Sequence, residues 1–161
     1  MKRIVSLVAF VMLSVFAVMC FLPIMFKESF YKAGNDPLNA IYTHNSSSDK
    51  LRSLFKVDAS GISYIVLTLI AIGIVVLILQ FAGKRSSILN ILSFTPVLAF
   101  CLFIVTILIR ININDPDDWH LIELQGFYSE FSLGWGTIIG IAIILAVSVM
   151  SFLIAIRKID D

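Results

Sequence analysis

The stretch that decides the fold is residues 62–82, which read ISYIVLTLIAIGIVVLILQFA and contain no charged side chain. An α-helix rises about 1.5 Å per residue and the hydrocarbon core of a bilayer is about 30 Å thick, so roughly 20 apolar residues are needed to cross it. Three further stretches have the same character, at residues 4–26, 88–109 and 133–156. None has an Asp, Glu, Lys, Arg or His in its interior. The pattern predicts four transmembrane helices.

Composition supports an all-α membrane protein with a single four-helix transmembrane domain over residues 1–161. Of the 161 residues, 59% are hydrophobic and 14% are charged, whereas soluble proteins carry about 25% charged residues. A membrane β-barrel is excluded because the stretches are apolar on every side rather than alternating. The formal net charge of +1 and the lack of a basic cluster argue against a nucleic-acid partner.

The first apolar stretch has two interpretations. Met1, Lys2 and Arg3 give a basic start of the kind that opens a secretory signal. However, no small-x-small cleavage site precedes the first charged residue after the stretch, and apolar residues continue through Phe26. We therefore interpret residues 4–26 as an uncleaved first helix.

The positions of lysine and arginine in short segments predict the orientation, because these residues are retained on the cytoplasmic side. Three pairs fall at one end of the predicted bundle: Lys2 with Arg3, Lys84 with Arg85, and Arg157 with Lys158. The other end carries residues 27–61 and 110–132, in which acidic residues outnumber basic ones. We expect both termini to be cytoplasmic, these two segments to be extracytoplasmic, and the membrane to be the plasma membrane.

The first outer segment is expected to carry a short amphipathic helix at residues 49–56. Leu51, Leu54 and Phe55 have the i, i+3, i+4 spacing that places side chains on one helix face. Such a face can rest on the lipid surface or dock a partner. Asn45 begins an Asn-Ser-Ser sequence that matches the N-glycosylation pattern, and the sequence leaves its modification open.

The second outer segment contains the densest polar cluster, which includes Asp115, Asp117 and Asp118. Carboxylates suit a hard cation, but the glycine and terminal glutamate of a calcium loop are missing, so we expect no metal and a second short helix capped by an aspartate. Aromatic residues follow near the fourth span. They are expected to lie at the lipid headgroups or to contact a partner, and they are Trp119, Phe127, Tyr128 and Trp135.

Small residues in the fourth span predict close helix packing. Gly136 and Gly140 form one small-xxx-small pair, and Ala142 and Ala146 form a second. Gly73 in the second span lacks a small partner four residues away, so it is expected to tolerate alanine. Pro96 is expected to kink the third span, because proline removes one backbone hydrogen bond.

The side chains that the four apolar stretches lack argue against several classes of membrane protein. Membrane pumps place carboxylates, histidines or basic residues inside the bundle, and these four stretches have no Asp, Glu, Lys, Arg or His. His44 and His120 lie in separate outer segments, and Cys20 and Cys101 lie in apolar stretches, so we expect no catalytic site and no cofactor. The favoured function is a non-catalytic subunit that scaffolds, assembles or regulates a larger membrane complex with other membrane subunits. The alternative is a transporter or channel subunit whose pathway forms with partner chains.

The layout of four spans, a long first outer segment, a short inner turn and a shorter second outer segment resembles that of claudins and other tetraspan proteins. Claudins carry a tryptophan and paired cysteines in the first outer loop, and tetraspanins carry cysteines in a large second loop. This chain has no cysteine in either outer segment. The resemblance is therefore one of layout, and it assigns no role to any residue.

Overall fold

The computed structural model describes residues 2–32, 43–44, 50–57, 61–84, 86–112 and 127–156. The described chain is mostly helical, and four helical segments are long and apolar enough to cross a membrane. They are α1 (Lys2–Phe21), α3 (Ile62–Phe81), the pair α4 (Ser87–Leu92) and α5 (Thr95–Asn112), and α7 (Trp135–Ala155). The prediction of four apolar helices is confirmed, and the chain is compatible with an integral membrane protein.

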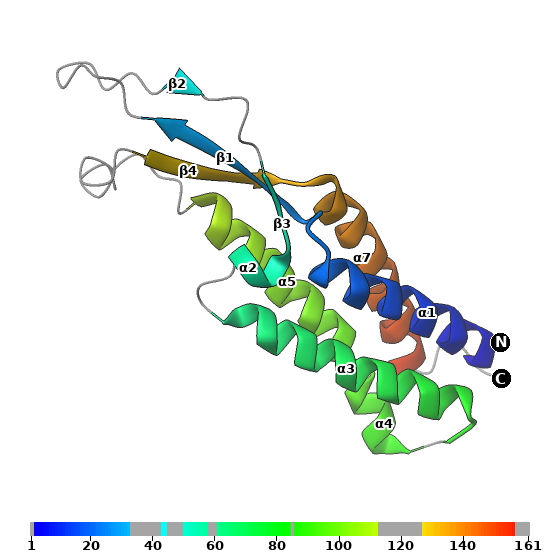
Figure 1. Ribbon diagram of the computed structural model, residues 1–161. Helices are drawn as coiled ribbons and strands as arrows, with labels where there is room; N and C mark the ends of the chain where they lie inside the picture. The colour runs from blue at the N-terminus through cyan, green and yellow to red at the C-terminus, as the bar shows by residue number, and fades with distance from the viewer. Residues whose placement is uncertain are drawn as a thin grey trace.

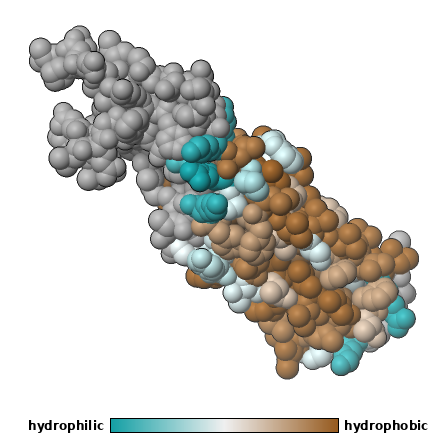
Figure 2. All heavy atoms as spheres, viewed as in Figure 1, coloured by the Kyte–Doolittle hydropathy of each residue, from teal (hydrophilic) through white to brown (hydrophobic). Residues whose placement is uncertain are grey.

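The helices form a four-membered bundle in which α1 and α5 each pack against both α3 and α7. Figure 1 shows that α1 begins and α7 ends at the same end of the bundle, whereas the strands extend from the opposite end. Brown apolar side chains cover the visible face of the bundle in Figure 2. A large apolar surface of this kind is unfavourable in water and favourable in the hydrocarbon core of a bilayer.

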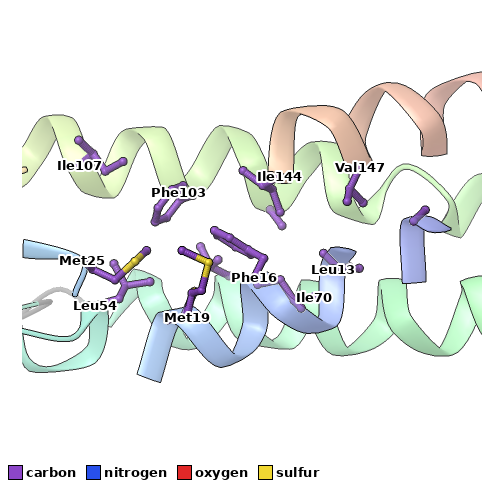
Figure 3. Packing of buried hydrophobic residues seen from close by; sticks show 14 of the residues in the cluster. Leu13, Phe16, Met19, Met25, Leu54, Ile70, Phe103, Ile107, Ile144 and Val147 are labelled. Carbon is purple, nitrogen blue, oxygen red and sulfur yellow. The ribbon is translucent and has the colours of Figure 1, made fainter. Parts of the chain in front are cut away.

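The centre of the bundle is filled by large apolar side chains. Phe16 of α1 and Phe103 of α5 meet edge to face, with ring centroids 5.1 Å apart. Figure 3 shows these two rings pointing toward each other between the helices. Leu13, Ile70 and Ile144 are also fully buried. Every one of the four bundle helices contributes to this core.

The first helix ends earlier than its apolar stretch does. We expected one helix over residues 4–26, but α1 ends at Phe21, residues 22–25 form a turn, and Phe26 begins a strand. Pro23 accounts for the difference, because proline disfavours a helical conformation in the residue before it and cannot donate a helical hydrogen bond. Met25 and Phe26 are buried against the bundle rather than exposed to lipid.

The third span is broken at Ser93 and Phe94, between α4 and α5. Pro96 lies in the first turn of α5 and has no amide hydrogen to donate to the Leu92 carbonyl. The hydroxyl of Thr95 donates to that carbonyl instead, at 2.8 Å. The helical structure of the span is therefore interrupted next to the proline.

The described parts of the two segments that flank the bundle, residues 27–61 and 110–132, contribute strands to one antiparallel sheet. Its strands are β1 (Phe26–Lys32), β2 (Thr43–His44), β3 (Lys50–Arg52) and β4 (Phe127–Leu133). β1 pairs with β2 and β3 along one edge and with β4 along the other.

The amphipathic helix expected at residues 49–56 is therefore wrong for its first half. Lys50–Arg52 is strand β3, and only Leu54–Val57 is helical, as α2. Isolated short helices are marginal, and pairing with β1 gives these residues cross-strand hydrogen bonds that a single helical turn does not. The short helix expected in the second outer segment lies outside the described residues.

Candidate functional site

The candidate site is the junction where the sheet meets the bundle, formed by the turn after α1 and the beginning of α7. The Gly134 amide donates to the Met25 carbonyl at 2.8 Å, and the Gly136 amide donates to the Ile24 carbonyl at 3.0 Å. The buried Thr137 hydroxyl also donates to the Met25 carbonyl. These bonds continue the β1–β4 pairing into the first turn of α7, so the sheet and the bundle share one hydrogen-bonded frame.

Glycine is required at the junction because the two backbones approach so closely. A Cβ atom on Gly136 would lie 2.6 Å from both the carbonyl oxygen and the Cγ1 atom of Ile24. A Cβ atom on Gly134 would also collide with the Ile24 carbonyl oxygen. Neither position has room for a side chain unless the backbone moves.

The predicted small-residue positions of α7 do not lie on one buried face. Gly136 and Gly140 are buried, and a Cβ on Gly140 would lie 3.1 Å from the Phe16 ring of α1. Ala142 is exposed and Ala146 is half-buried. The glycine pair therefore contacts the first helix and its following turn within the same chain, and Ala142 is left open on the outer surface.

An aromatic cluster lies beside the junction. The rings of Phe21 and Phe55 stack with centroids 4.8 Å apart, and Phe55 also contacts Tyr64 at 5.5 Å. Leu54 is only 1% exposed, whereas Leu51 is 47% exposed. The expected common face of Leu51, Leu54 and Phe55 is therefore wrong for Leu51, because that residue belongs to a strand.

An ion pair fastens β3 to β1. The Arg52 Nε atom donates to Glu28 Oε2 at 2.6 Å. Glu28 is only 8% exposed, and a buried carboxylate without a charged partner is costly. Arg52 therefore matters more to Glu28 than it would to a carboxylate on the surface. The register places Glu28 opposite Lys50 and Arg52 opposite Phe26, which makes the ion pair diagonal.

The remaining outer positions are only partly placed by the structure. Phe127 and Tyr128 are in β4, opposite Lys32 and Tyr31. Trp135 begins α7 and is 56% exposed. Among the described residues no group of three His, Cys, Asp or Glu side chains could hold a metal ion. Several predicted positions lie outside the described residues: Asn45, Asp115, Asp117, Asp118, Trp119 and His120.

Gly73 differs from its expected environment. We expected it to tolerate alanine, but it is buried where α3 crosses α1 and α5. An added Cβ would lie 3.1 Å from Leu13 Cδ2, 3.2 Å from Pro96 Cγ and 3.3 Å from Thr95 Oγ1. The proline ring is rigid and the Thr95 hydroxyl is engaged, so the space for a methyl group is tight on three sides.

Several polar side chains inside the bundle bond to backbone carbonyls or to one another. Thr106 donates to Leu102 of its own helix, and Ser148 lies within reach of the carbonyls of Ile144 and Pro96. The sequence did not indicate that Gln80, which is 3% exposed, donates to Ser93 at 2.5 Å. This bond links α3 to the break between α4 and α5.

Sequence reasoning missed most of the junction. Ile24 and Met25 act through their carbonyl oxygens, which side-chain patterns do not report. Two weak signals were present: Pro23 near the end of the first apolar stretch, and the Gly-Trp-Gly sequence at residues 134–136. No protein-family model matches the sequence, and no curated protein matches it closely enough to serve as a relative.

Proposed function

We propose that this chain is a non-catalytic membrane subunit that scaffolds, assembles or regulates a larger membrane complex. The observation that carries the proposal is the junction, where Gly134 and Gly136 bond the start of α7 to the carbonyls of Ile24 and Met25. It makes the sheet a continuation of two membrane helices. A partner held by the sheet would be held in a defined position relative to the bundle.

The outer edge of β4 offers the first docking surface. Within the described part of the chain, β4 pairs only with β1, so its other edge has no strand beside it. Antiparallel pairs alternate between residues that bond the neighbour and residues whose amides point away. The Gly134 amide donates to the Met25 carbonyl, so the amides of Ser132 and Glu130, at every second residue along β4, also point toward β1. The amides of the alternate residues, Ser129 and Phe131, point outward. A partner can add an extended strand to such an edge.

The exposed face of α7 offers the second surface, inside the membrane. Ile138, Ala142, Leu145 and Val149 are all exposed, and their spacing places them along one face of the helix. A small residue in the middle of an apolar face permits another helix to approach closely. Ala142 is therefore the position at which a partner span would pack.

The orientation belongs to the same proposal. Lys2 and Arg3 open α1, and Arg3 lies beside Gly83 in the turn after α3 that also contains Lys84. Figure 1 shows the sheet at the opposite end of the bundle from the start of α1. Retention of basic residues in the cytoplasm puts both termini inside and the sheet outside a plasma membrane. The sheet would then recruit the extracytoplasmic part of a partner.

A transporter or channel subunit is the second candidate. Its pathway would form between this chain and partners, because the described centre of the bundle is occupied by Leu13, Phe16, Phe103 and Ile144. The hydroxyls of Thr95, Thr106 and Ser148 are engaged with backbone carbonyls. Both features favour a scaffolding subunit over a transporter or channel subunit. Solute flux into vesicles containing the purified chain and its partners would support the transport function.

Purification from native membranes in mild detergent, followed by mass measurement, tests the proposal. The expected species contains the 17.9 kDa chain together with at least one different membrane protein in fixed ratio. Recovery of only the isolated chain, from several mild detergents and from chemically crosslinked membranes, would contradict a scaffold function.

A further inference from the structure

An apolar groove of about 310 Å³ runs along the outside of the bundle between α3 and α4. It exists because α4 is separated from α5 by the break at Ser93 and Phe94, and none of the six residues of α4 is buried. The short helix α4 does not pack closely along α3, and the groove lies between the two helices. The groove is lined by Ala71, Ile72, Val75, Val76, Leu79, Leu89 and Leu92.

Two basic residues meet at the turn that follows α3, next to the groove. The backbone amide of Lys84 donates to the carbonyl of Leu79, a lining residue, at 3.0 Å, which places the Lys84 backbone close to one end of the groove. The Arg3 guanidinium reaches the same turn, because its Nη2 atom lies 2.8 Å from the position that a Cβ on Gly83 would occupy. Within the described part of the chain neither side chain has an acidic partner. Both are exposed.

We propose that the groove binds one anionic phospholipid, with an acyl chain between α3 and α4 and the phosphate at Arg3 and Lys84. The depth agrees with this occupant: Ala71 to Leu79 spans about 12 Å of helix, close to the roughly 15 Å of hydrocarbon in one leaflet. The charge also agrees, because basic side chains at a helix end attract anionic headgroups. The bound lipid would fill the space that the break in the third span leaves.

Native mass spectrometry of the full chain tests this proposal with two lipids that differ only in the headgroup. Phosphatidylglycerol and phosphatidylcholine with identical acyl chains would be added in equal amounts to the detergent-solubilised protein. We expect one retained phosphatidylglycerol per chain, with a preference on the order of tenfold over phosphatidylcholine. The double variant Arg3→Gln, Lys84→Gln should lose this preference, and Lys56→Gln at the opposite end should keep it. Equal retention of both lipids by the parent would overturn the headgroup contact.

A matched pair of phenylalanine variants tests the groove itself. Ala71→Phe places a ring in the groove and should abolish retention of the lipid, whereas Val15→Phe places the same ring on the exposed face of α1 and should leave retention unchanged. Both positions are exposed, so both variants should keep the parent's melting temperature in detergent. Retention of the phosphatidylglycerol by Ala71→Phe at the parent's level would overturn the proposal. If Ala71→Phe melts early, Val75→Phe on the same groove wall replaces it under the same criterion.

Discussion

The backbone amide of Gly136 lies 3.0 Å from the carbonyl oxygen of Ile24 and donates a hydrogen bond to it. This bond joins the first turn of the last helix to the turn that follows the first helix. It lies next to the last β1–β4 pair, Phe26 with Leu133. The chain thus closes its bundle and aligns its sheet through the same few backbone atoms.

Alanine at the two glycines of α7 should have unequal effects. Gly136→Ala pushes a methyl group against a backbone oxygen at 2.6 Å, and overpacking of this kind costs about 1–3 kcal/mol. Gly140→Ala meets side-chain atoms alone, the edge of the Phe16 ring at 3.1 Å and Met25 Cε at 3.6 Å, and side chains adjust more readily than a backbone carbonyl, so its cost should be smaller. Thermal melting in detergent measures both. Equal melting temperatures for the two variants would contradict the close approach at Gly136.

Removal of the Thr137 hydroxyl should loosen the junction. Thr137→Val preserves the shape but removes the buried donor to the Met25 carbonyl, and loss of one such bond costs about 1 kcal/mol. Thr137→Ser retains the donor and serves as the control. Hydrogen exchange of the β1 amides should become faster in the valine variant and stay near the parent's rate in the serine variant. The same exchange rates in all three proteins would show that the hydroxyl does not hold the junction.

The Glu28–Arg52 pair should contribute measurable coupling between β1 and β3. Glu28 is buried, so we expect a coupling free energy of about 1 kcal/mol, near the upper end for partly exposed ion pairs. A double-mutant cycle with Glu28→Gln and Arg52→Gln, measured by unfolding in detergent, isolates this term. A coupling free energy below about 0.3 kcal/mol would show that the ion pair does not stabilise the contact between β1 and β3.

Single cysteines at the two ends of the bundle test the orientation. A membrane-impermeant maleimide applied to intact cells should label Lys56→Cys, which is exposed beside the sheet, and should not label Ser87→Cys, which is exposed at the start of α4. Permeabilised cells should label both. Labelling of Ser87→Cys alone in intact cells would reverse the assignment of inside and outside.

The sequence predicts the membrane helices well because lipid imposes a simple requirement. A stretch such as residues 62–82 has to satisfy its backbone internally and present apolar side chains in all directions, so composition and length are sufficient. Gly136 and Gly140 also stand out, since glycine in a membrane helix often marks close contact. The neighbours of each glycine in the folded chain cannot be predicted from the residues beside it in the sequence. Gly73 is an example, because its neighbours come from α1 and α5.

The sheet could not be predicted from local pattern. Leu51, Leu54 and Phe55 have helical spacing, yet Leu51 belongs to β3 because its backbone pairs with Lys27. The partner strand β4 comes from the far end of the sequence, and its register with β1 depends on the close approach at Gly134. Interactions of this range are set by tertiary structure, which outweighs local propensity in short segments.

The most direct test of the docking surface compares two prolines in β4. Ser129→Pro removes an amide that points away from β1, whereas Glu130→Pro removes one that bonds β1, so only the latter should lower the melting temperature of the isolated chain. The measurement is the amount of partner protein that co-purifies from native membranes per mole of this chain. We predict that Ser129→Pro melts like the parent and loses most of its partner. Full retention of the partner by a folded Ser129→Pro variant would contradict recruitment through the edge of β4.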